Sequence, residues 1–358
     1  MQLGAYFLPL DFDTYLTSVK VADEVGYSHA WIPDSVMIWE DPYIYMARGL
    51  EATENLTFGT AVTNPVTRHY TASAAAHATL AQIHPGRVMI GLGRGDSSIR
   101  TLGLRPTKIK EMRTIVPNLR RLAAGEQIDL DGKDVRITWA KTSDMPLMLG
   151  GSGPRTLRLA GSLADAVTIE VGAHPESVAW AVGNIRQGAE EAGRDPDSLQ
   201  IIALCGVWIG DDLEQARDNC RWAPASAINL IAEVMHNNAD HGMPPSLTGL
   251  LDRRRELVTA PSSGPAAGVP SLDGSYDYEE HCENDADHTQ WMPDDLIDEF
   301  ILSGSAEAVA ARIEKLAALG VSQVAAAFLN GHDEQMRQVG KELIPLLSEI
   351  PPASGRVG

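Results

Sequence analysis

The sequence is poor in cysteine and in basic residues, and it contains no long hydrophobic run. Its 358 residues include three cysteines (Cys205, Cys220 and Cys282), which are widely spaced and form no CxxC motif, so structural disulfides are not expected. No apolar run reaches about 18 residues, which excludes an ordinary membrane-spanning helix. The N-terminal MQLGAYFLPLDFDTY lacks the basic region that begins a signal peptide, so we expect a cytoplasmic protein.

Basic residues are outnumbered by acidic ones. Lysine and arginine together number 29 against 48 aspartates and glutamates, and the net charge is −19. A surface of this charge argues against nucleic acid and anionic membranes as partners. We expect a small-molecule substrate and, for the protein itself, a homodimer. A bound metal is not expected, because four histidines of one region do not have the spacing of a zinc site: His236, His241, His281 and His288.

Short apolar segments alternate with amphipathic ones along most of the chain. Helical stripes of apolar residues separate segments that are typical of buried strands. The expected strands are 2–8, 29–33, 56–62, 87–93, 145–151, 165–170, 199–209 and 322–328. Eight strands separated by helices predict a parallel sheet closed into an α/β (β/α)₈ TIM barrel, because open sheets of this type usually stop nearer six strands.

Two segments depart from this alternation within what we expect to be a single domain, residues 1–358. Residues 126–140 are typical of a small hairpin that turns at Asp131-Gly132. Residues 236–295 form a long insertion between the seventh and eighth strands, with a Ser/Gly/Pro/Ala tract at 261–274. The insertion should lie over the C-terminal face of the barrel, where it is either a lid or a spacer.

Barrel enzymes place their active sites at the C-terminal ends of the strands, so the residues that follow each strand are the candidates. Asp34, Ser35 and Trp39 follow the second strand. Asp34 is either a structural cap or a reactive carboxylate, and Trp39 either lines a pocket or covers the edge of the core. Thr63, Asn64, Arg68 and His69 follow the third strand, where His69 is a ligand group or a structural residue.

Two glycine-rich turns follow the fourth and fifth strands. GLGRGD at 91–96 lets the backbone approach a ligand at Gly93, Arg94 and Gly95, and it places Asp96 as an acid or base. Its position at the fourth strand excludes a Rossmann fingerprint. GGSGPR at 150–155 favours a phosphate at Gly151, Ser152 and Gly153, because Pro154 begins a helix there; the alternative is an ordinary tight turn. Glu170 follows the sixth strand, where it faces the pocket or pairs with a neighbour.

Together these motifs resemble the luciferase-like monooxygenase superfamily, and within it the F420-dependent branch of methylenetetrahydromethanopterin reductases and glucose-6-phosphate dehydrogenases. The resemblance rests on four segments: WIPDS (31–35), GTAVTNPVTRH (59–69), HPGRVMIGLGRGD (84–96) and GGSGPRTLRLAGSLADAV (150–167). It implies a deazaflavin ring near Asp34 and against residues 61–64, with a cis peptide bond between Ala61 and Val62.

The resemblance also implies that Gly93–Asp96 belong to the cofactor pocket, Gly151–Gly153 to the phosphate site and Trp39 to the pocket wall. Five basic residues after the fourth strand are candidates to meet the negatively charged F420 tail: Arg94, Arg100, Lys108, Lys110 and Arg113. There are two departures from the sugar-phosphate dehydrogenases. Ser35 stands where they have a histidine base, and Asp96 stands where they have a glutamate. Oxidation of a sugar hydroxyl by their mechanism is therefore not expected.

The sequence and the resemblance together predict an F420-dependent oxidoreductase that transfers a hydride between deazaflavin C5 and a small organic substrate. Asp34 and Asp96 are the expected catalytic residues. The expected cofactor contacts are Ser35, Ala61, Val62, Thr63, Asn64, Gly93, Arg94, Gly95, Gly151, Ser152 and Gly153, and the expected substrate contacts are Trp39, His69 and Glu170. The alternatives are an FMN-dependent two-component monooxygenase of the bacterial luciferase type and a non-catalytic flavin-binding protein.

Overall fold

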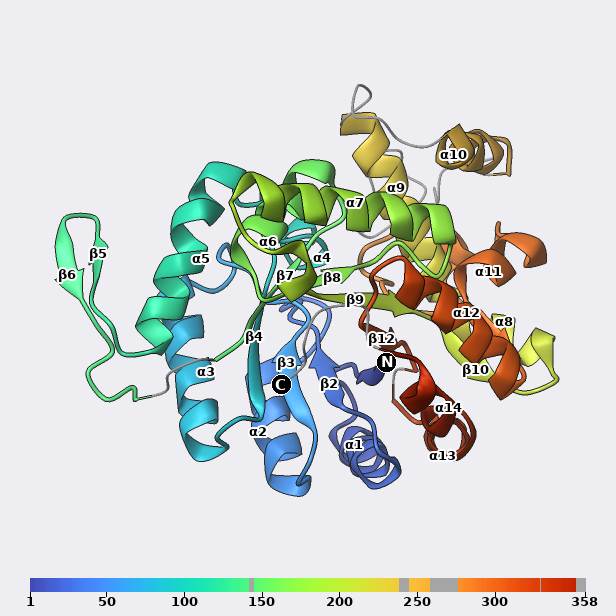
Figure 1. Ribbon diagram of the computed structural model, residues 1–358, viewed down its shortest axis with the longest axis horizontal. Helices are drawn as coiled ribbons and strands as arrows, with labels where there is room; N and C mark the ends of the chain where they lie inside the picture. Colours follow the sequence, from blue (N-terminus) through green and yellow to red (C-terminus); the bar gives the residue numbers. More distant parts are fainter. Residues whose placement is uncertain (142–144, 238–244, 258–275, 329, 352–358) are drawn as a thin grey trace.

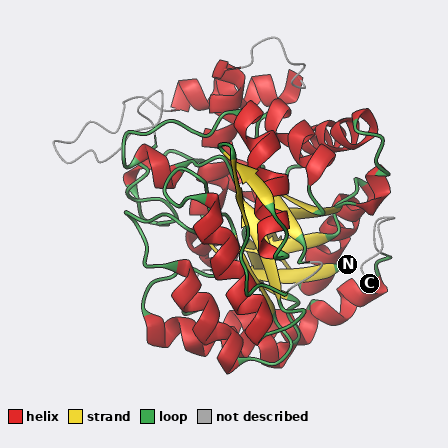
Figure 2. Ribbon diagram, turned by 90° about the vertical axis from the view of Figure 1, so that its left-hand side faces the viewer, coloured by secondary structure: helices red, strands yellow, loops and turns green. Residues whose placement is uncertain are grey.

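Eight parallel strands close into a barrel in the computed structural model, which describes residues 1–141, 145–237, 245–257, 276–328 and 330–351. Figure 2 shows the strands at the centre with helices around them. Neighbours around the barrel are β1 (Gln2–Tyr6), β12 (Gln323–Ala326), β9 (Gln200–Cys205), β8 (Ala166–Ile169), β7 (Leu147–Gly150), β4 (Val88–Leu92), β3 (Thr57–Thr60) and β2 (His29–Ile32). The predicted barrel is confirmed.

The outer helices bury one face against the strands. In α1, Tyr15, Val19 and Ala22 recur at helical spacing and are fully buried, while Gly26 ends the helix in a left-handed conformation. Helix α1 spans Phe12–Val25. The other helices around the barrel strands are α2 (Pro42–Ala52), α3 (Tyr70–Ile83), α4 (Ser97–Arg100), α5 (Ile109–Ala123), α6 (Pro154–Leu163), α7 (Pro175–Glu191), α12 (Ala306–Ala318), α13 (Asp333–Glu342) and α14 (Ile344–Glu349).

Large side chains fill the barrel interior below its C-terminal mouth. Trp31, Met89, Met148 and Ile202 come from four different strands and are buried in one cluster. The Trp31 indole donates a 2.8 Å hydrogen bond to the Gln323 side chain, which satisfies its buried N–H group. This part of the interior is therefore a packed core, and a cavity opens nearer the strand ends.

The predicted strand over residues 199–209 is wrong in one respect, because it is two strands. β9 ends at Cys205, and β10 (Val207–Ile209) leaves the barrel to pair in parallel with β11 (Leu302–Gly304), a strand that we did not predict. Gly206 separates them, and a Cβ atom there would lie 2.7 Å from the Cys220 Cβ. Two helices follow β10, namely α8 (Leu213–Cys220) and α9 (Trp222–Asn237).

The insertion after β10 contains more regular structure than its sequence indicates. It includes α10 (Pro245–Leu257), the short 3-10 helix η2 (Asp287–Thr289) and α11 (Asp294–Phe300). The tract at 261–274 lies outside the described residues. The cap segment, residues 276–293, contains the buried side chains Tyr276, Tyr278 and Cys282, so this part of the predicted lid packs against the molecule. Figure 1 shows α9 and α10 together beyond the barrel.

The predicted hairpin is confirmed. β5 (Ile128–Leu130) and β6 (Lys133–Val135) pair in antiparallel register around Asp131-Gly132, and they project away from the barrel in Figure 1. The three cysteines are buried free thiols. In the part of the chain that the structure describes, no helix has the length and hydropathy needed to cross a membrane.

Candidate active site

A cavity of about 500 Å³ opens at the C-terminal ends of the barrel strands. Its floor is apolar and includes Tyr6, Trp31, Val62, Leu204 and Ala325, which come from four barrel strands and the loop after β3. Glycines and arginines form one rim, and carboxylates form another wall. A cavity of this size and mixed lining is typical of a small-molecule or cofactor site.

The peptide bond between Ala61 and Val62 lies against this floor and is cis, as the resemblance implied. Two glycines make room for the Val62 side chain. A Cβ atom on Gly93 would lie 2.5 Å from Val62 Cγ2, and one on Gly150 would lie 3.1 Å from Val62 Cγ1. The glycines after β4 and at the end of β7 thus set how deeply Val62 sits.

The basic rim combines a helix N-terminus with two arginines. Pro154 begins α6 after Gly153, which provides no side-chain cap. The Thr156 and Leu157 N–H groups bond the Gly153 carbonyl, which leaves the Arg155 N–H group at the open start of the helix. Arg94 donates to the Thr107 carbonyl at 2.6 Å, and burial and the nearby Arg155 lower its pKa. Among the described residues, no carboxylate forms an ion pair with either arginine. This rim is suited to an anion.

The opposite wall carries paired charges. Arg100 donates to Asp96 at 2.6 Å and to Glu233 of α9, and its guanidinium lies 4.8 Å from the centre of the Tyr278 ring. The Tyr278 hydroxyl donates to Glu233 at 2.9 Å. Arg100 therefore joins the loop after β4, helix α9 and the cap segment, which makes it a structural cross-link beside the cavity.

Glu170 lies at the cavity directly after β8. Its side chain is half-buried and accepts a 2.5 Å hydrogen bond from the Ser226 hydroxyl of α9. Burial raises the pKa of Glu170 to about 7; the Ser226 hydrogen bond opposes this shift and the charge of Asp96 adds to it. A carboxyl group with a pKa near neutrality, facing a cavity, can both donate and accept a proton.

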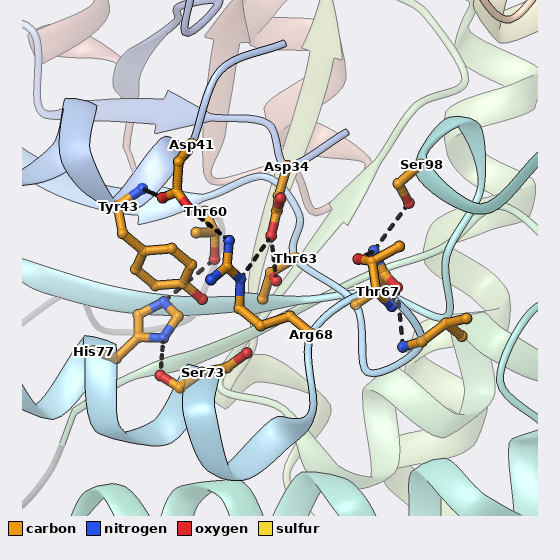
Figure 3. Close-up of polar contacts among 12 residues, drawn as sticks. Asp34, Asp41, Tyr43, Thr60, Thr63, Thr67, Arg68, Ser73, His77 and Ser98 are labelled. Carbon is orange, nitrogen blue, oxygen red and sulfur yellow. Dashed lines mark hydrogen bonds and ion pairs between the residues drawn. The ribbon is translucent and has the colours of Figure 1, made fainter. Parts of the chain in front are cut away.

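Asp34 occupies a different buried cluster, shown in Figure 3. It accepts a 2.6 Å hydrogen bond from the Thr63 hydroxyl and lies 3.6 Å from the Arg68 Nε. Arg68 also donates to Asp41 at 2.8 Å and stacks on the Tyr43 ring. Burial raises the pKa of Asp34, while Thr63 and Arg68 oppose that rise. Asp34 is not among the residues that line the cavity, and its contacts hold the loop after β3.

The cavity brings together many of the expected contacts. Those in its lining are Ala61, Val62, Gly93, Arg94, Gly95, Asp96, Gly151, Ser152, Gly153 and Glu170. Of the other basic candidates after β4, Arg100 lines the cavity, whereas Lys108, Lys110 and Arg113 are exposed on or before α5 and lie outside its lining.

The other expected residues have contacts outside the cavity lining. The Asn64 side chain accepts from the N–H groups of Val66 and Thr67, and Ser35 hydrogen-bonds Ser97 at 2.7 Å. Trp39 is buried with its ring centre 5.7 Å from that of His281.

His69 is exposed and accepts from the Thr71 N–H group at the start of α3. Like Asn64, it orders the chain between β3 and α3. The sequence left a structural role and a functional role open for both His69 and Asp34. In the structure, both side chains make hydrogen bonds to the chain around them.

Sequence reasoning missed several residues of this region. Tyr6 lines the cavity, and Ser226, Glu233, Tyr276 and His281 surround its acidic side, yet we predicted none of them. Four of them come from α9 and the cap segment. Their sequence neighbours carry no motif, so only the packing of the insertion reveals them.

The fold and this site define a (β/α)₈-barrel enzyme with a cofactor-sized cavity at its C-terminal face. The model of the luciferase-like monooxygenase family matches residues 5–323, and the chain belongs to this family of enzymes. It is 28% identical over 359 residues to a 5,10-methylenetetrahydromethanopterin reductase of Archaeoglobus fulgidus, with 97% of this chain and 100% of the relative covered.

Two further comparisons involve F420-dependent enzymes. The chain is 31% identical over 242 residues to an F420-dependent glucose-6-phosphate dehydrogenase of Nocardia farcinica, with 62% of this chain and 71% of the relative covered. The structure of a coenzyme F420 dependent tetrahydromethanopterin reductase from Methanopyrus kandleri superposes with a TM-score of 0.74 at 22% identity, over 96% of this chain and 98% of that one. The predicted resemblance is confirmed.

Proposed function

We propose that this protein is an F420-dependent oxidoreductase that transfers a hydride between the deazaflavin and a small organic substrate. The observation that carries the proposal is one cavity in which an apolar floor meets a glycine-lined cationic rim. A deazaflavin has the complementary parts, an aromatic ring and an anionic tail. The F420-dependent relatives support this cofactor.

The residues present fit such a cofactor at both ends. A Cβ atom on Gly153 would meet only Val234 Cγ2, at 3.8 Å, so this glycine leaves space at the rim that a ligand can fill. Arg94 and Arg155 supply positive charge beside the uncapped start of α6. Tyr6, Ala61 and Val62 provide the surface on which a planar ring can pack.

When bound, F420 supplies or accepts two electrons as a hydride at C5. The residues of this chain have three tasks around it. The rim holds the anionic tail, and the floor fixes the ring plane by packing. Asp34, through Thr63 and Arg68, keeps the loop after β3 in place as a positioning residue.

Titration with cofactor alone tests the proposal. Purified protein should quench the fluorescence of oxidised F420 saturably, and FMN at equal concentration should not compete. Turnover of reduced F420 is then followed by its absorbance with a panel of small aldehydes, ketones and cyclic imines. Saturable FMN binding without F420 binding would instead support a flavin-dependent monooxygenase, and tight F420 binding without turnover would support a non-catalytic binding protein.

A further inference from the structure

A row of polar side chains leads away from the cavity at Glu170. The Ser226 hydroxyl donates to Glu170 Oε1 at 2.5 Å, and Ser226 also lies close enough to Tyr276 to lower the pKa of that phenol. The Tyr276 hydroxyl in turn lies 2.5 Å from Nδ1 of His281. The four residues come from the end of β8, from α9 and from the cap segment, so the row exists only in the folded chain.

The number of protons on each group determines which residue of the row donates and which accepts. Each hydroxyl has a single proton, and Ser226 directs its proton at Glu170. Tyr276 can then donate to Ser226 and accept from His281 Nδ1–H, so that every hydroxyl both accepts and donates. Burial lowers the pKa of His281 to about 4, so the ring is neutral at pH 7 and can carry its proton on Nδ1.

Burial differs between the middle of the row and its two ends. Ser226 and Tyr276 are each 2% exposed, whereas the His281 ring is only half-buried, between Trp39 and Trp222. At the other end, Glu170 Oε2 has no hydrogen-bond partner among the described residues, and Glu170 borders the cavity. The row thus runs from the cavity, through fully buried hydroxyls, to a partly accessible imidazole.

We propose that Glu170 gives and takes the proton that accompanies hydride transfer, and that Ser226, Tyr276 and His281 are the path along which this proton is replaced. The inference rests on the proposed function and goes beyond it by naming the acid–base residue and the substrate class. The substrate has a carbon double-bonded to oxygen or nitrogen. The carbon gains the hydride, the electron pair of the π bond moves to the heteroatom, and the Glu170 proton goes to that heteroatom.

The proton that Glu170 gives to the substrate is replaced along the row. The carboxylate left on Glu170 receives the Ser226 proton, and Ser226 receives that of Tyr276. Tyr276 receives the Nδ1 proton of His281 as Nε2 of the same ring takes a proton from water, so the imidazole stays neutral. In the oxidation direction every step reverses. Two electrons leave the reduced deazaflavin with the hydride, so no other reductant is needed.

Other ionisable groups also face Glu170, and they determine its titration. Asp96 faces it from the loop after β4, Tyr6 from β1, and Tyr276 and Cys282 from the cap segment. All are acids, and the Asp96 charge favours the protonated form of Glu170. Arg100 offsets part of this field through its ion pair with Asp96.

Infrared titration of the cofactor-free protein tests the row directly. The C=O stretching band of a protonated carboxyl group should disappear with a midpoint near pH 7, and Glu170→Gln should remove that band. Ser226→Ala should move the midpoint upward by about one unit, because the carboxylate loses a hydrogen bond. Tyr278→Phe is the matched control, since its hydroxyl contacts Glu233 and Asn229 instead, and it should leave the midpoint unchanged.

Turnover with reduced F420 and the carbonyl and imine panel gives the second readout. Glu170→Gln should lower kcat about 100-fold or more without changing F420 affinity, and it should abolish the fall in rate as pH rises past 7. Tyr276→Phe should lower kcat about 10-fold and change the solvent deuterium isotope effect. A wild-type pH profile in Glu170→Gln, or no titrating band in the wild type, overturns the inference. A titrating band with no F420 binding overturns the proposed function, and the proton-transfer role with it.

Discussion

The Thr63 hydroxyl donates a 2.6 Å hydrogen bond to the Asp34 carboxylate, and this bond ties the end of β2 to the loop after β3. Thr63 directly follows the cis bond on the cavity floor. Asp34 does not line the cavity, whereas Ala61 and Val62 of the loop that it contacts do. The catalytic role that the sequence predicted for Asp34 stays a prediction.

Thr63→Val should destabilise the fold by about 1–3 kcal/mol, because a buried carboxylate loses a hydrogen bond. It should also raise the pKa of Asp34 further, since the Thr63 bond lowers it. Urea unfolding measures the first effect. Thr79→Val removes an exposed hydroxyl that bonds within α3, and it should change stability little. Equal losses in the two variants would contradict the role given to Thr63.

Arg100→Met should leave Asp96 and Glu233 without their shared cation. We expect a loss of about 1–3 kcal/mol in the free energy of unfolding, because unpaired, partly buried carboxylates are costly. Adding Glu233→Gln should recover part of that loss. A double-mutant cycle checks the coupling, and strictly additive effects would show that Arg100 and Glu233 act independently.

Arg155→Gln should weaken F420 binding about 10-fold, because a charge-assisted contact to the anionic tail is removed. The control is Arg158→Gln on the same helix. Arg158 donates to Asn184 of α7 and does not line the cavity, so this change should leave the affinity as it is. Fluorescence titration at two salt concentrations measures both variants, and an unchanged Kd for Arg155→Gln would remove this arginine from the anion site.

The stability of the wild type should depend on pH through Glu170. Its pKa rises from 4.5 to about 7 on folding, so the folded state binds the proton more tightly than the unfolded state does. The stabilising contribution is complete below pH 4.5 and is lost as pH rises through 7. Glu170→Gln lacks this dependence, so its stability relative to the wild type should be higher at pH 8 than at pH 5. Parallel curves from thermal unfolding would refute the shifted pKa.

The barrel could be predicted from the sequence because its strands are short, apolar and regularly separated by helices. The apolar periodicity of each segment indicates which of its faces is buried. The division of residues 199–209 at Gly206 could not be predicted, since both halves are apolar and only the partner strand differs. The partner strand, Leu302–Gly304, is about a hundred positions away in the sequence. No local pattern predicts such a distant pairing.

The candidate site was predictable where backbone chemistry determines it. Gly93 and Gly151–Gly153 line the cavity, and glycines in these turns had indicated that the backbone could approach a ligand closely. The surroundings of Glu170 could not be predicted from the sequence, because its partner Ser226 and the neighbouring Tyr276 are 56 and 106 positions further along the chain. A carboxylate's pKa is set by such distant packing, so its residue type and strand position were insufficient.

The β10–β11 pairing has a consequence for how such a chain can change. Val207–Ile209 and Leu302–Gly304 are paired strands, so the segment between them begins and ends at neighbouring positions in the structure. None of the barrel's own hydrogen-bonded strand pairs includes either of these strands. Residues between them can be lengthened, shortened or exchanged while the strand register of the barrel persists. The turns that line the cavity after β4 and β7 do not belong to this segment, so the two regions can vary separately in sequence.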